Sequence, residues 1–305
     1  MRASGVFGAG TQTRVVRPTA AGDARRWLGA AALLALVLAG VVLVATSGGP
    51  RPPRPAPNRK TATLPRPGAP IPRDPRALAG ALASTTTALD AAIDRWRAGG
   101  DPARGGPPRD VSLLARFEQR VYLRLGRRPA LARATLARLP RALRPAARDN
   151  VQARRELARI TSVHRGPPPK IRIGRAEPAD VLRRDYEAAR RRFGVDPALL
   201  AAVNFVESAF GRLRNRSVSG AQGPMQFVPA TWRAYGLGGD IRDPHDAILG
   251  AANYLNASGA PADERRALFH YNPSPSYVSA ISRYARRIRA DWRAFYAYYA
   301  WRPTI

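Results

Sequence analysis

Residues 201–228, AAVNFVESAFGRLRNRSVSGAQGPMQFV, place one acidic residue, Glu207, within an apolar helical pattern. Asp196 and Pro197 precede this pattern and are typical of a helix N-cap and first turn, so a helix is predicted from Pro197 to Gly211. Apolar residues recur at i, i+4, i+7 and i+11, the periodicity of a core-facing stripe, at Leu199, Val203, Val206 and Phe210. The segment therefore predicts a buried helix that carries a carboxylate in its last turn.

Glu207 lies beside the apolar stripe, one turn beyond Val203. Burial penalises the charged carboxylate, and the negative end of the helix dipole does the same, so both effects raise its pKa toward neutrality. A carboxyl group that stays protonated near pH 7 is suited to general acid catalysis. The alternative is an edge glutamate whose carboxylate reaches water or pairs with Arg212 or Arg214, as structural ion pairs commonly do.

The chain after this helix offers polar and aromatic groups suited to a sugar-binding groove. The run SGAQGPMQF at 219–227 contains two glycines and a proline, so it predicts a defined loop that presents the amide of Gln226. Tyr254 falls on a predicted helix, and Tyr271 and Asn272 fall where a helix must end before Pro273. A tyrosine hydroxyl near Glu207 is expected to hold the carboxyl group by a hydrogen bond.

Periodicity elsewhere predicts an all-α fold. Helices are expected at 110–126, with Asp110 as N-cap and Gly126 as the stop, and at 178–194. Others are expected from Asp243 to near Gly259, and after the PSPS of 273–276. No strand longer than the IRI of 171–173 is predicted. The aromatic C-terminal segment, 291–305, is expected to dock as a helix on the domain rather than to form an exposed sugar platform.

The N-terminal part of the chain reads as a membrane anchor. Residues 27–46 carry no charge and would span about 30 Å as a helix, the thickness of a hydrocarbon core. The preceding tail, 1–26, is basic, which predicts that it stays in the cytoplasm, that the chain crosses the membrane once and that everything after residue 46 is exported. Residues 47–75 are rich in proline and predict an extended linker. A cleaved signal peptide is the alternative, but the apolar stretch is longer than usual and lacks a clear cleavage site.

Composition limits the remaining possibilities. The formal charge is +30, but residues 201–305 contain 13 Arg against 7 Asp plus Glu, a net +6, so +24 belongs to residues 1–200. The excess charge is therefore interpreted as a surface property, and export disfavours nucleic acid as a partner. The chain has no cysteine. Its three histidines lack the spacing of metal ligands, so neither a metal site nor a cofactor is expected.

Four motifs occur in a characteristic order: ES at 207–208, GPMQF at 223–227, AANYL at 251–255 and HYN at 270–272. Together they resemble the catalytic domain of the soluble lytic transglycosylases, a goose-lysozyme-like helical fold that cleaves peptidoglycan. The resemblance covers about residues 178–290, which leaves a helical region at 76–165 that packs on this domain or stands apart. It implies a catalytic acid/base at Glu207, supported by the neighbouring Ser208. It also implies substrate-cleft residues and a tyrosine-asparagine pair, at Met225, Gln226, Tyr254, Tyr271 and Asn272.

The mechanism follows from the number of carboxylates. Most glycosidases use two, but residues 197–235 offer only Glu207. One carboxyl group suffices if Glu207 protonates the glycosidic oxygen and then removes a proton from the C6 hydroxyl, giving a 1,6-anhydro sugar. The alternatives are a goose-type hydrolase that uses water positioned by a carboxylate such as Asp240, and a non-catalytic wall-binding protein. Partners among cell-wall synthesis or division proteins are not identified by the sequence.

Overall fold

The computed structural model describes residues 64–161, 171–217 and 219–303, and over these residues the protein is α-helical. The first half consists of α1 (Pro75–Gly99), α2 (Arg109–Arg127), α3 (Pro129–Arg138), the 3₁₀ turn η1 (Arg141–Leu143) and α4 (Arg144–Thr161). The second half consists of α5 (Ala179–Phe193), α6 (Pro197–Ser208), α7 (Pro229–Tyr235), α8 (Pro244–Ala257), α9 (Glu264–Tyr271), α10 (Pro275–Ala290) and α11 (Arg293–Ala300). The prediction of an all-α fold is confirmed for these residues, and Ile173 forms only an isolated bridge with Leu213.

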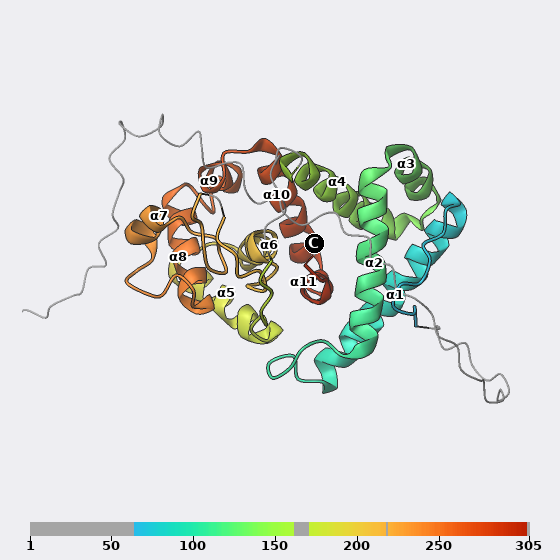
Figure 1. Ribbon diagram of the computed structural model, residues 1–305, viewed down its shortest axis with the longest axis horizontal. Helices are drawn as coiled ribbons and strands as arrows, with labels where there is room; N and C mark the ends of the chain where they lie inside the picture. The colour runs from blue at the N-terminus through green and yellow to red at the C-terminus, as the bar shows by residue number, and fades with distance from the viewer. Residues whose placement is uncertain (1–63, 162–170, 218, 304–305) are drawn as a thin grey trace, which may run out of the picture.

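Helix α6 lies at the centre of the core. All of its residues except Val206 are buried, because its composition is apolar on every side apart from Asn204, Glu207 and Ser208. Helices α5 and α8 pack on one side of it and α10 on the other, and α10 also packs along α4 (Figure 1). The buried residues of both halves form one continuous cluster. The helical region at 76–165 therefore packs against the part of the chain that carries Glu207.

The C-terminal helix α11 joins the two halves, as Figure 1 shows by its place between α6 and α2. Its aromatic side chains are buried, and Trp301 after it is only 2% exposed. The ring of Tyr298 stacks on Phe205 of α6 at 5.2 Å, and Trp301 contacts Tyr122 of α2 at 6.1 Å. Gln119 of α2 also exchanges two hydrogen bonds with the backbone of Arg302. The docking prediction is confirmed, and this segment is not an exposed sugar platform.

Helix boundaries differ from the sequence prediction at four places. One is α10, which begins at Pro275, within the PSPS of 273–276 rather than after it. Asp110 is not an N-cap: α2 begins at Arg109 directly after Pro107 and Pro108, and Asp110 lies in the first turn. The same helix continues past Gly126 to Arg127, and the next residue is extended because it precedes Pro129. Helix α6 ends at Ser208 rather than at Gly211, because the three residues after Ser208 adopt left-handed backbone. By contrast Asp196, Asp243 and Ser274 cap their helices through side-chain hydrogen bonds.

The predicted membrane crossing at 27–46 and the tail at 1–26 lie outside the described residues. Within the described part of the chain, none of the helices combines the length and apolarity that a membrane crossing requires. The end of the proline-rich stretch is described, and it is held against α2: Arg120 donates to the carbonyl of Ala69 and Arg124 to that of Ile71.

Candidate active site

The chain reverses direction immediately after Glu207 and Ser208. Ala209, Phe210 and Gly211 adopt positive φ angles of 51°, 63° and 77° in succession. Two of these residues are not glycine, and left-handed backbone at such residues is unfavourable and is held only where the surroundings fix it. Burial of the Phe210 ring, which stacks on Phe205 at 5.5 Å, supplies that constraint. The reversal ends α6 at Ser208, three residues earlier than predicted.

Glu207 is buried, with 5% of its surface exposed. One carboxyl oxygen, Oε1, accepts a hydrogen bond of 2.6 Å from the hydroxyl of Tyr277, while Oε2 is buried and has no hydrogen-bond partner among the described residues. Burial raises the pKa of Glu207 to about 8, and the Tyr277 hydrogen bond opposes this rise only in part. The side chain is therefore mostly protonated at neutral pH, as a general acid must be.

The ion-pair alternative for Glu207 is wrong. The Arg212 guanidinium donates to the carbonyl of Ala209 and lies over the ring of Tyr299 at 4.3 Å. Arg214 donates to the carbonyl of Arg175. Over the described residues, neither arginine forms a salt bridge with Glu207. The buried acid thus has a hydroxyl donor beside it and, in this part of the chain, no paired cation.

Ser208 fixes the loop that follows. Its hydroxyl is fully buried, donates to the carbonyl of Pro224 at 2.5 Å and accepts from the backbone N–H of Gly211 at 2.7 Å. One side chain therefore holds both the chain reversal and the GPMQF motif at 223–227. This position fits a residue that supports Glu207 through the backbone rather than by direct contact.

The GPMQF loop is a tight turn closed by paired hydrogen bonds of 3.0 Å between Gln222 and Phe227. Gly223 has a φ of 79°, and a Cβ added there would lie 1.9 Å from the carbonyl oxygen of Ile241, so the packing requires glycine. Gln226 also has a positive φ, and its amide group donates to the carbonyls of Gly223 and Asn215. The side chain of Met225 is fully buried. In this structure Met225 and Gln226 therefore hold the loop together.

Tyr271 does not hold the carboxyl group of Glu207, contrary to the hydrogen bond expected from the sequence. Its hydroxyl donates to the carbonyl of Met225 at 2.6 Å, so it braces the loop. Its ring packs against Phe227 at 5.9 Å and Tyr254 at 5.6 Å, and the Tyr254 hydroxyl donates to the carbonyl of His270. The tyrosine that bonds Glu207 is Tyr277, because the first turn of α10 brings its hydroxyl to the end of α6.

Asn272 ends α9, where its backbone N–H donates to the carbonyl of Leu268. Its side-chain oxygen Oδ1 is buried and has no hydrogen-bond partner within the described chain. A buried, unpartnered acceptor is unfavourable unless a further group supplies a donor. Tyr271 and Asn272, the pair implied by the resemblance, therefore both lie at the C-terminal end of α9.

Asp240, the alternative second carboxylate, is exposed and takes part in a local turn. Its carboxylate accepts from the backbone N–H of Arg242 at 2.8 Å. Its own N–H donates to the carboxylate of Asp246. These contacts give Asp240 a structural function at the start of α8.

Sequence reasoning missed Tyr277, although a signal for it was present. Tyr277 precedes Ile281 and Tyr284 at helical spacing and so belongs to the buried face of α10. That spacing predicts burial, but no pattern within α10 indicates which helix end its hydroxyl meets. Across the described residues, no group of three or more His, Cys, Asp or Glu side chains could hold a metal ion.

Residues 186–293 match the family model of the transglycosylase SLT domain. The matched range begins in α5, ends at the first residue of α11 and includes every residue described above as part of the site. No solved structure matches the chain. The match confirms the resemblance to the lytic transglycosylase SLT domain for residues 186–293, and at the level of that domain family it supports peptidoglycan as the substrate class and glycosidic bond cleavage of the transglycosylase type.

Proposed function

We propose that the protein is a lytic transglycosylase that cuts the β-1,4 bond between N-acetylmuramic acid and N-acetylglucosamine in peptidoglycan and leaves a 1,6-anhydro product. The observation that carries this proposal is the state of Glu207: a buried carboxyl group with a raised pKa, one oxygen bonded to Tyr277 and the other without a partner among the described residues. The family match supplies the substrate class.

The reaction needs one carboxyl group in two protonation states. Protonated Glu207 donates its proton from the unpartnered Oε2 to the glycosidic oxygen, and the bond from that oxygen to the anomeric carbon of the muramic acid breaks. The resulting carboxylate then takes the proton of the C6 hydroxyl, whose oxygen bonds to the anomeric carbon. The hydroxyl is already part of the sugar, so it attacks at a high effective concentration. No water is consumed, and Glu207 ends protonated as it began.

Tyr277 stabilises the ionised intermediate state of Glu207. Its hydroxyl donates to Oε1, and a hydrogen bond to a charged acceptor is stronger than one to a neutral acceptor. The loop at 223–227 is fixed by Ser208, Met225, Gln226 and Tyr271, and Ser208 ties it to the end of α6 that carries Glu207. Tyr254, whose ring packs on Tyr271, and Asn272, whose Oδ1 has no partner among the described residues, are proposed to contact the glycan.

The test is the chemistry of the product. The wild-type protein, given purified peptidoglycan, should release fragments that end in 1,6-anhydro-N-acetylmuramic acid, which mass spectrometry separates from reducing ends because they are one water lighter. The Glu207→Gln variant should release fragments with neither anhydro nor reducing ends, since the amide can neither donate the proton to the glycosidic oxygen nor accept one. Asp240→Asn is the matched control and should leave the anhydro product unchanged. Reducing ends that disappear in Asp240→Asn would instead establish a hydrolase, and binding without any release would establish a wall-binding protein.

We also propose that residues 27–46 anchor the protein in the cytoplasmic membrane, with the described helices on the cell-wall side. The uncharged length of this segment and the arginines before it support the proposal. The protein should fractionate with membranes, and protease added from outside should remove everything beyond about residue 50. A mature form that begins near Ser47 and is free in the medium would show signal cleavage instead.

A further inference from the structure

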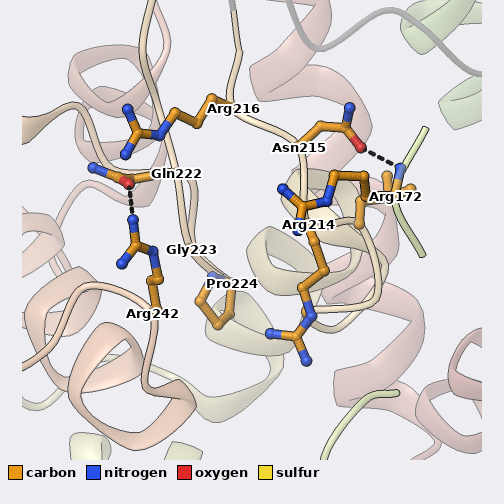
Figure 2. A pocket seen from close by; sticks show the side chains of 10 residues that line it. Arg172, Arg214, Asn215, Arg216, Gln222, Gly223, Pro224 and Arg242 are labelled. Carbon is orange, nitrogen blue, oxygen red and sulfur yellow. Dashed lines mark hydrogen bonds between the residues drawn. The ribbon is translucent and has the colours of Figure 1, made fainter. Parts of the chain in front are cut away.

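A cationic groove of about 620 Å³ opens beside the GPMQF loop. Figure 2 shows Arg216, Gln222 and Arg242 along one side, Arg172, Arg214 and Asn215 along the other, and Gly223 and Pro224 between them. No acidic residue is among its described lining residues. Four arginines therefore surround one groove, which the distribution of charge along the sequence did not reveal.

These four arginines differ in their contacts from Arg283, Arg286 and Arg289 of α10. On α10, Arg283 and Arg286 pair with Asp149, and Arg289 pairs with Asp196 and Glu264. In the groove, Arg214 donates to the carbonyl of Arg175, and Arg242 donates to the amide oxygen of Gln222, at 3.3 Å. Over the described residues, none of the four groove arginines forms a salt bridge. Positive charge gathered in this way favours an anionic ligand.

Two residues that line the groove also bond to the residue next to the catalytic acid. Gly211 and Pro224 both line it, and both are hydrogen-bonded to Ser208, the residue next to Glu207. The wall of the groove is therefore linked, through the buried side chain of Ser208, to the residue next to the acid that cuts the glycosidic bond.

We propose that this groove binds the carboxylates of the peptide that the substrate carries on its muramic acid residues. The inference rests on the proposed function, in which every cut occurs at such a sugar. The N-acetylated sugars themselves are uncharged, so the peptide carboxylates are the anionic part of the strand closest to the cut. A groove of this volume accommodates a short peptide, and guanidinium groups on both of its sides can pair with carboxylates along it.

Binding to two kinds of glycan strand tests the proposal. Both are prepared free of phosphate-containing polymers. One retains its peptides; from the other an amidase has removed the peptides, and the lactyl carboxylates that this exposes have been converted to neutral amides. The double variant Arg216→Gln/Arg242→Gln should bind peptide-bearing strands about 5- to 30-fold more weakly than the wild type, as expected for two partly exposed ion pairs. Its binding to stripped strands should not change. Arg191→Gln/Arg265→Gln removes the same charge from exposed positions outside the groove and is the matched control.

Each other outcome overturns the proposal. If the double variant binds both kinds of strand more weakly by the same factor, the groove binds the sugar chain. If it binds neither more weakly, the groove takes no part in substrate binding. Weakening that appears only when phosphate-containing wall polymers are added back would identify phosphate as the ligand. All proteins in this comparison also carry Glu207→Gln, so binding is measured without turnover. Absence of the anhydro product from the protein with Glu207 intact would refute the proposed reaction while leaving this result intact.

Discussion

Replacing Glu207 by Gln should make the folded protein more stable relative to the wild type as the pH rises. The carboxyl group titrates at 4.5 in an unfolded chain and at about 8 in the folded protein. Between these values the unfolded chain is ionised while the folded one keeps its proton, so unfolding releases a proton and becomes more favourable as the pH increases. The amide side chain of the Glu207→Gln variant cannot ionise, so the variant does not lose stability in this way.

The magnitude follows from the two pKa values. Relative to the fully protonated state, the carboxyl group costs the folded protein about 1 kcal/mol at pH 5, about 3 kcal/mol at pH 7 and about 5 kcal/mol at pH 9. The variant carries a constant penalty, because its amide N–H₂ takes the place of the buried Oε2 and finds no acceptor among the described residues, which costs about 1–3 kcal/mol at every pH. Only the change with pH is diagnostic, and it amounts to about 2–3 kcal/mol between pH 5 and pH 7.

The assay is urea unfolding of the full-length wild type and variant at a series of pH values, with detergent present in every sample. Other buried acids such as Glu118, whose pKa burial raises to about 7, occur in both proteins and cancel in the difference. In a thermal assay the same change of about 2–3 kcal/mol corresponds to about 5–10 °C for a domain of this size. A difference between the two proteins that stays constant from pH 5 to pH 9 would refute the reasoning, because it would mean that Glu207 titrates as it does in water.

Other consequences of the site geometry can be measured directly. The activity of the wild type should fall as the pH rises through about 8, where the acid loses its proton. Tyr277→Phe should lower turnover about 10- to 100-fold, since it removes the hydrogen bond to the ionised acid, and should shift this decline to higher pH. Tyr271→Phe should instead lower the free energy of unfolding in urea by about 1 kcal/mol and have little effect on that pH profile. A shifted pH profile with unchanged stability would show that Tyr271 bonds to Glu207. Ser208→Ala should destabilise the fold by about 1–3 kcal/mol, because the buried Pro224 carbonyl and Gly211 N–H lose their partner, and unchanged stability would contradict this assignment.

The helical fold and the burial of Glu207 could be predicted because their signals are local. Helix α6 is encoded by an Asp-Pro start and an apolar stripe, and the burial of Glu207 follows from its place beside that stripe. The loop at 223–227 was likewise indicated by its glycines and proline, whose backbone preferences act within a few residues. The family resemblance rests on the same short motifs and their order.

The partners of these residues were decided by tertiary structure alone. Tyr277 and Tyr271 are both tyrosines near a proline. Because α10 packs on α6, the Tyr277 hydroxyl bonds to Glu207, whereas the Tyr271 hydroxyl bonds to the Met225 carbonyl. The cationic groove combines Arg172 with Arg242, residues 70 positions apart, and no periodic pattern relates them. Contacts between distant segments depend on how whole helices pack, and local sequence preferences contain no information about that arrangement. The sequence alone therefore determined the helices and the acid, whereas the packing of the helices determined which hydroxyl, loop and arginines surround it.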